Sequence, residues 1–194
     1  STVEELEACG TFAQASTAEE LIAKGKQYFD HRQYTEAARC WRRAVRAGDA
    51  SGAALADFAM AVHEKANAEA AGSAAAFKKA ADAFEKLAGE LEKSARDGGA
   101  SPSGAQLGTT LDRLGVRSST CWERAAKCFE EAGRPAKAGE IYAQRLRRPD
   151  LAAPCFERVE EWIKAGDQWR LCGEAADGTG KKRALEVYVE GGRD

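Results

Sequence analysis

The chain has few of the residue types from which most catalytic and metal sites are built. Only two of its 194 residues are histidine and one is methionine. His31 and His63 lie far apart and without the clustered cysteine or acidic ligands that a metal ion needs, so we expect no metal site. The six cysteines include no Cys-X-X-Cys pair, and no serine lies in a nucleophile elbow. We therefore expect no enzyme, no catalytic residue and no cofactor in this chain.

Long apolar runs and an excess of one charge are also absent. No run approaches the roughly 20 apolar residues that span a bilayer, so we expect no membrane insertion. No N-terminal signal segment is visible, and we expect reduced thiols in the cytoplasm or the nucleus. The 29 basic and 31 acidic residues give a net charge near −2, which provides no overall attraction to nucleic acid or anionic lipid.

Residues that favour helices are abundant, whereas β-branched residues and the four prolines are sparse. Alanine, leucine, glutamate, lysine and arginine all have high helix propensity. The composition therefore predicts an all-α protein, and the expected reduced thiols predict that it is intracellular.

A helix-turn-helix signature occupies the region between Ala18 and Val45. Its two helices are expected over about Ala18–His31 and Tyr34–Ala47. The key positions alternate between small and large residues, namely Leu21, Gly25, Tyr28, Ala37, Trp41 and Ala44. A glycine on the first helix lets the second helix approach closely, and an aromatic residue then fills the space beside it. This order is typical of a tetratricopeptide repeat, or TPR.

A segment rich in glycine, serine and proline, at 97–110, divides the chain into two halves. We expect a flanking segment at 1–16, in which 3–8 is a short helix, and TPR-like repeats with an elongated second unit at 17–96. A loop is expected at 97–110. Further TPR-like or SNAP-like repeats follow at 111–194.

The second half contains two Ala-Gly pairs, Ala132-Gly133 and Ala165-Gly166, which are 33 residues apart. We expect each pair to end a helix, so that one helix contains 156–163. The four tryptophans are expected to be core anchors. Exposed apolar residues near 185–189 lack a following helix, and the chain starts without methionine, so we expect a piece of a longer protein.

Three blocks, at 16–41, 125–142 and 182–192, come in the order seen in the helical array that follows the motor of large UvrD-like superfamily-one helicase proteins. TPR-and-ankyrin-repeat-containing proteins belong to this group, and the chain resembles it. The resemblance implies a TPR-like right-handed α-solenoid of antiparallel helix pairs. It also implies a helicase-associated scaffold or protein-binding module. The ATP-binding motifs of the helicase are not in this chain, so no ATPase is assigned to it.

The TPR resemblance further implies a concave groove formed by the first helices, in which a protein or peptide partner lies. Transfer of the repeat register gives the expected partner-binding residues Lys26, Phe29, Glu123, Arg124, Lys127, Glu131 and Glu157. It also places Ile22, Phe156 and Glu160 in the groove. Ile22 and Lys26 replace the lysine and asparagine with which chaperone-binding TPR domains hold a terminal carboxylate, so we do not expect that ligand.

Two alternatives stay open from the sequence. The chain could be a nucleic-acid-binding accessory region of a helicase, in which a stripe of basic residues contacts phosphates. That stripe consists of Arg39, Arg42, Arg43 and Arg46. The chain could also be a SNAP-like adaptor. Cys121, Cys128 and Cys155 could converge on one another, although core packing is the favoured interpretation, and the oligomeric state is not predicted.

Overall fold

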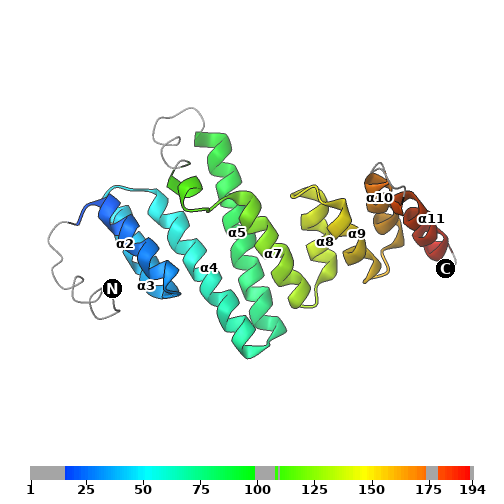
Figure 1. Ribbon diagram of the computed structural model, residues 1–194, viewed down its shortest axis with the longest axis horizontal. Coiled ribbons are helices and arrows are strands. Elements are labelled where there is room, and N and C mark those ends of the chain that lie inside the picture. Colours follow the sequence, from blue (N-terminus) through cyan, green and yellow to red (C-terminus); the bar gives the residue numbers. More distant parts are fainter. Residues whose placement is uncertain (1–15, 99–107, 109, 174–178, 193–194) are drawn as a thin grey trace.

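The structure is a computed structural model that describes residues 16–98, 108, 110–173 and 179–192. Every regular element in these ranges is a helix, which confirms the all-α prediction. The helices form an extended row, and most of them pack against their neighbours in sequence (Figure 1). Among the helices in these ranges, none is both long and apolar enough to cross a bilayer. The expected helix at 3–8 and most of the 97–110 loop lie outside the described residues.

The first pair consists of α2 (Ala18–Asp30) and α3 (Tyr34–Arg46). Thr17 caps α2, because its Oγ1 accepts from the backbone N–H of Glu20 at 3.2 Å while the Glu20 carboxylate accepts from the Thr17 N–H at 3.0 Å. A Cβ atom on Gly25 would overlap the indole of Trp41. The Trp41 Nε1–H donates to the backbone oxygen of Ile22 at 3.1 Å. This contact confirms the predicted nesting of glycine and tryptophan.

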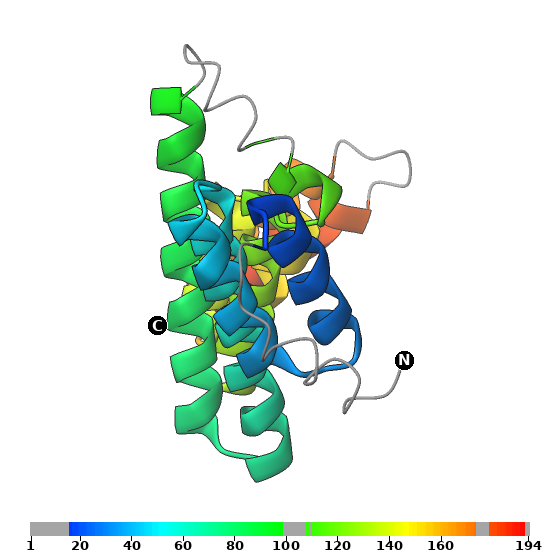
Figure 2. The ribbon, with the colours of Figure 1, turned by 90° about the vertical axis from the view of Figure 1, so that its left-hand side faces the viewer.

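The next two helices are the longest of those described. α4 (Ser51–Ala71) has 21 residues and α5 (Ala74–Gly98) has 25. Gly72 follows α4 in the left-handed conformation, with a φ of 58°, and so reverses the chain where glycine carries no Cβ penalty. Figure 2 looks along the row from the α2 end and shows α5 running past its neighbours. α5 includes Asp97, so the predicted loop begins later than expected.

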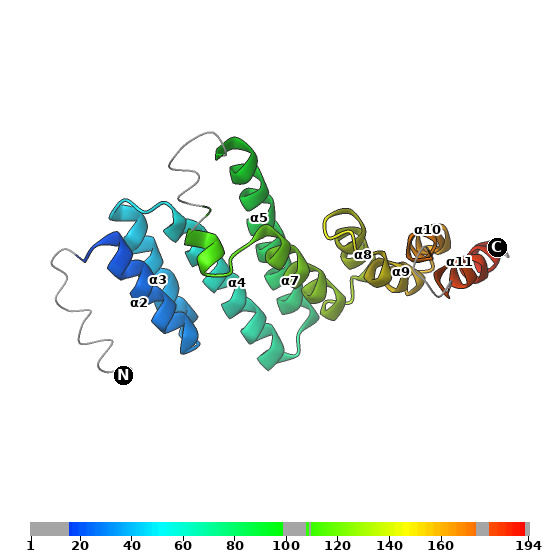
Figure 3. The same ribbon diagram turned by 45° about the horizontal axis from the view of Figure 1, so that its top comes forward.

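Shorter helices complete the row. After a helical segment at 110–113, α7 to α11 continue the row beyond α5 (Figure 3). Their bounds are α7 (Ser118–Glu131), α8 (Pro135–Gln144), α9 (Pro149–Glu157), α10 (Trp162–Cys172) and α11 (Thr179–Gly191). Prolines open α8 and α9, where the missing N–H would have no partner within the helix.

The expected single helix over 156–163 is wrong. α9 ends at Glu157, a turn occupies 158–160, and α10 begins at Trp162. Gly166 therefore lies in the middle of α10 rather than at its end. A Cβ atom on Gly166 would overlap the Tyr188 ring of α11. The small residue there allows close packing, as at Gly25, and does not stop the helix.

The core extends along the row, but the tryptophans differ in their burial. Trp41 is 2% exposed and Trp122 is 6% exposed, whereas Trp162 and Trp169 are only partly buried. Cys121, Cys128 and Cys155 are buried free thiols, and no cluster of three metal-ligating residues occurs in the described ranges. Burial raises the pKa of Cys121 to about 11, so this thiol stays protonated at neutral pH.

Candidate partner-binding groove

A hollow lies between α4, α5 and α7 and reaches the turn after α9. We call it the α4–α7 groove. Its walls are mainly polar, and Phe77 of α5 contributes an apolar surface. The charged residues that line it are Lys65, Glu69, Lys127, Glu130, Glu131 and Arg158. Two predicted partner-binding residues, Lys127 and Glu131, therefore lie in this groove, and a third, Glu123, lies one turn earlier on α7.

The groove presents charges of both signs on α4 and α7. On α4, Lys65 Nζ lies 3.1 Å from Glu69 Oε1, and on α7, Lys127 Nζ lies 3.2 Å from Glu123 Oε1. Each pair joins residues four apart, and Lys127 and Glu123 are both more than half exposed. Exposed pairs of this kind contribute little to stability, roughly 0.3–0.5 kcal/mol each. Breaking the exposed Lys127–Glu123 pair would therefore cost little stability.

Glu130 fixes one side of the groove through contacts with two later elements. Its carboxylate accepts from the Tyr142 hydroxyl at 3.0 Å, from Arg158 Nη1 at 3.3 Å and from the Cys155 thiol at 3.6 Å. Burial, together with this carboxylate, raises the pKa of Cys155 to about 12 and the pKa of Tyr142 well above its usual value. Both groups therefore stay protonated and act as donors that position Glu130, which in turn positions Arg158.

Arg124 is directed at aromatic rings within the chain. Its guanidinium lies 5.4 Å from the centre of the Phe58 ring and 6.0 Å from the centre of the Phe84 ring. These rings belong to α4 and α5, so Arg124 of α7 joins three helices through cation–π contacts. The structure thus gives this predicted partner-binding residue a packing role.

The predicted residues of α2 lie apart from the α4–α7 groove. Lys26 pairs with Asp30 at 2.6 Å on the same helix. Phe29 is half-buried, and its ring centre lies 5.8 Å from that of Phe58 in a stacked arrangement. Ile22 and Phe156 are each only 3% exposed, and neither lines the α4–α7 groove. Their apolar surface is used in the core, which the repeat register could not distinguish from a ligand face.

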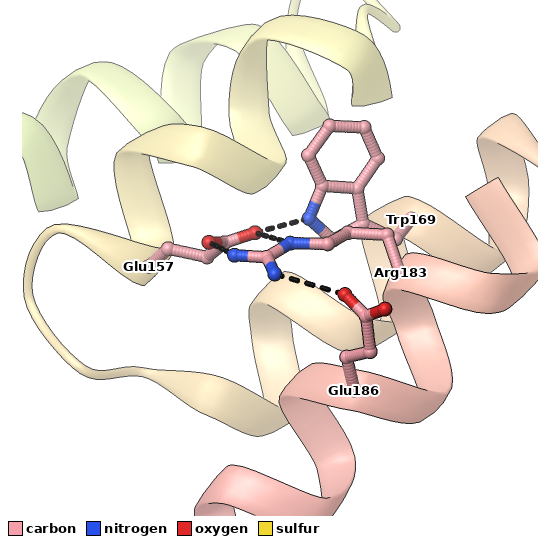
Figure 4. A network of polar contacts seen from close by, with 4 residues as sticks. All are labelled: Glu157, Trp169, Arg183 and Glu186. Carbon is pink, nitrogen blue, oxygen red and sulfur yellow. Dashed lines mark hydrogen bonds and ion pairs between the residues drawn. The ribbon is translucent and has the colours of Figure 1, made fainter. Parts of the chain in front are cut away.

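Glu157 is bound by side chains of the chain itself (Figure 4). Its carboxylate accepts from the indole N–H of Trp169 and from two nitrogens of Arg183, which also contacts Glu186 at 3.0 Å. Its side chain is only 17% exposed. Burial alone would raise the pKa of Glu157, but the hydrogen bonds from Arg183 and Trp169 lower it below its usual value. This predicted partner-binding residue thus joins α9, α10 and α11.

The same arrangement occurs at three junctions, and we call it the three-helix staple. In each case a glutamate of one helix accepts from an aromatic N–H or O–H of the helix packed beside it, and from an arginine in or just after the helix that follows that one. The three staples are Glu92–Trp122–Arg145, Glu130–Tyr142–Arg158 and Glu157–Trp169–Arg183. No sequence motif indicates these staples, because the glutamate and the arginine are separated by 53, 28 and 26 residues.

The arginine stripe lies on the solvent face of α3. Arg39, Arg42 and Arg46 are exposed and Arg43 is partly buried, opposite the buried Trp41. Arg39 pairs with Glu36 at 2.7 Å. Contact of this stripe with nucleic acid stays a prediction.

No family model, curated protein or solved structure matches the chain. The resemblance to TPR and helicase-associated arrays therefore depends on residue patterns alone. The α4–α7 groove is therefore the feature of the structure that bears on function.

Proposed function

We propose that the chain is a non-enzymatic protein-interaction or scaffold module, with a TPR-like array that receives a peptide segment in the α4–α7 groove. The observation that carries this proposal is the groove itself, in which α4 and α7 present charged rows beside the apolar surface of Phe77. A peptide with charged side chains of both signs and an apolar anchor fits this lining.

The staples support the proposal, because they hold the groove walls in place before a partner arrives. Glu130 sets the position of Arg158, and Arg124 ties α7 to α4 and α5. A surface that is rigid before binding loses little conformational entropy on binding. The α4–α7 groove is therefore suited to recognition of an extended or helical segment.

The parent protein is proposed from the sequence blocks. We infer that the module belongs to a larger helicase-related protein of the cytoplasm or nucleus, in which it recruits a protein partner. Its place beside a motor would make the groove a means of bringing that partner to the helicase.

The test is charge reversal in the groove. The immobilised chain is used to capture partners, which are identified by crosslinking and mass spectrometry and then measured with Lys127→Glu and Glu131→Lys. We expect each reversal to weaken a groove-bound partner about tenfold, with strong salt dependence, because both residues are exposed charges on the groove wall. Arg124→Glu is unsuitable as a test, since it would also remove the contacts to Phe58 and Phe84.

The matched control is Lys86→Glu on α5, because Lys86 is 79% exposed and does not line the α4–α7 groove. Capture in the control should equal that of the unaltered chain. A partner whose capture resists both reversals at Lys127 and Glu131 would remove the groove assignment.

A further inference from the structure

Helices α10 and α11 carry exposed apolar side chains. Four of the six large hydrophobic residues that are exposed in the described part of the chain lie on these two helices. Ile163 is 71% exposed and Leu171 is 60% exposed on α10, while Leu185 is 67% exposed and Val189 is 57% exposed on α11. A group of exposed apolar side chains on neighbouring helices is typical of an interaction surface.

These side chains form two neighbouring stripes. On α10, Ile163, Asp167 and Leu171 are spaced four residues apart and therefore share one face. On α11, Leu185 and Val189 share a face in the same way. The Tyr188 hydroxyl, next to Val189, donates to Asp167 Oδ1 at 2.6 Å. This bond joins the middle of the first stripe to the second.

Asp167 and Tyr188 repeat the first two members of a three-helix staple. The arginine of the third position is replaced here by Arg170 of the same helix, at 3.9 Å. The Asp167 side chain is 50% exposed, whereas the carboxylates of the other staples are 17% to 32% exposed. A further helix that brings a cation to Asp167 would therefore complete the arrangement seen elsewhere in the row.

A second copy of the chain can supply both that cation and the apolar contact. Lys182 lies three residues before Leu185 on α11 and is exposed. Within the described residues it makes no ion pair. The α10 stripe thus presents an acid between two apolar residues, and the α11 stripe presents a lysine beside two apolar residues. Such a surface is self-complementary under a two-fold rotation.

We propose that the face of α10 and α11 formed by these two stripes is a self-association surface, on which two copies of the chain pack with α10 of each against α11 of the other. Leu185 and Val189 of one copy then cover Ile163 and Leu171 of the second. Lys182 of each copy pairs with Asp167 of the other. The face is separate from the α4–α7 groove, so this proposal is independent of the proposed function.

Sedimentation velocity on the 194-residue chain over a concentration series tests the proposal. We expect a reversible dimer whose dissociation constant rises about a hundredfold in Leu185→Asp/Val189→Asp, because two charges replace the apolar contact of each copy. Lys182→Asp and Asp167→Lys should each raise the dissociation constant about tenfold. The double variant carrying both changes should restore it to within about threefold of the original, because the reversed charges face each other again.

Lys86→Asp on α5 is the control for a surface charge elsewhere, and circular dichroism checks that each variant keeps its helices. A chain that stays monomeric up to roughly 100 µM, at which even weak specific dimers are detected, would overturn the proposal. A dimer that is insensitive to the single charge changes, or one that the double variant fails to restore, would overturn it as well. Binding of a different protein to this face would appear as a monomer in this assay.

Discussion

Carboxylates at helix junctions are the residues that organise this molecule. Each of the three staple glutamates accepts a hydrogen bond from the N–H or O–H group of an aromatic side chain and forms an ion pair with an arginine. A carboxylate at a half-buried junction stabilises the fold when its oxygens accept hydrogen bonds. It destabilises the fold when they have no donor. The staples thus select the correct neighbour for each helix in addition to their modest contribution to stability.

The staple at Glu157 predicts a specific pH dependence. Because hydrogen bonds lower the pKa of Glu157 in the folded chain, this group stabilises the fold above the usual glutamate pKa. That stabilisation is lost as the pH falls through the lowered pKa. Glu157→Gln should cost about 1 kcal/mol in the free energy of unfolding at pH 7, since Arg183 is 45% exposed and its contribution is screened. It should also lose less stability on acidification.

Urea unfolding at neutral and acidic pH measures this effect. Glu186→Gln is the control, because Glu186 is 49% exposed and contacts Arg183 alone among the staple residues. We expect a change of less than about 0.5 kcal/mol for the control. Equal acid sensitivity of Glu157→Gln and the unaltered chain would contradict the assigned role.

At the scale of helices, glycine on one helix and an aromatic ring on the following helix set the distance between them. Trp41 covers Gly25 in the first pair, and Tyr188 covers Gly166 in the last. A side chain at either glycine would force the two helices apart, and the interior is too closely packed to absorb that displacement.

This packing predicts opposite effects for two glycine-to-alanine changes. Gly25→Ala should destabilise the chain by about 1–3 kcal/mol, because overlap with the Trp41 indole outweighs the gain in helix propensity. Gly89→Ala in α5 should instead stabilise it by roughly 0.5–1 kcal/mol, since no atom lies within 4 Å of the added Cβ. Thermal and urea unfolding measure both variants. Stabilisation by Gly25→Ala would refute the nesting.

Some of this helix packing could be predicted from the sequence, and some could not. The first pair was predictable because Gly25, Ala37 and Trp41 keep a fixed spacing within one short hairpin. The break between α9 and α10 was not, since Ala165-Gly166 has the same residues whether it ends a helix or nests against one. The repeat register predicted Lys127 and Glu131, which line the α4–α7 groove, and it also predicted Glu157, whose carboxylate binds Trp169 and Arg183. Contact of any of the three with a partner stays a prediction.

In the whole molecule, helices mostly contact their neighbours in sequence, so stability is expected to vary along the row. A local defect should weaken nearby helices far more than distant ones. The described ends of the row, α2 and α11, should respond independently of each other.

Hydrogen exchange followed by mass spectrometry tests this independence. Gly166→Ala should speed exchange in α10 and α11 by roughly tenfold or more, because it separates that pair, while α2 and α3 keep their protection. Gly25→Ala should produce the reverse pattern and serves as the reciprocal control. Uniform acceleration along the row in either variant would show that the chain unfolds as one unit.

The burial of the sulfur atoms has a consequence for chemical durability. Cys40, Cys121, Cys128 and Cys155 are buried free thiols with raised pKa values, whereas the Cys172 side chain is partly exposed. Oxidants and alkylating reagents attack the thiolate form, so they reach these four buried sulfurs once the surrounding helices have separated. The rate at which Cys121, Cys128 and Cys155 are alkylated therefore measures how often the helices in the middle of the row separate.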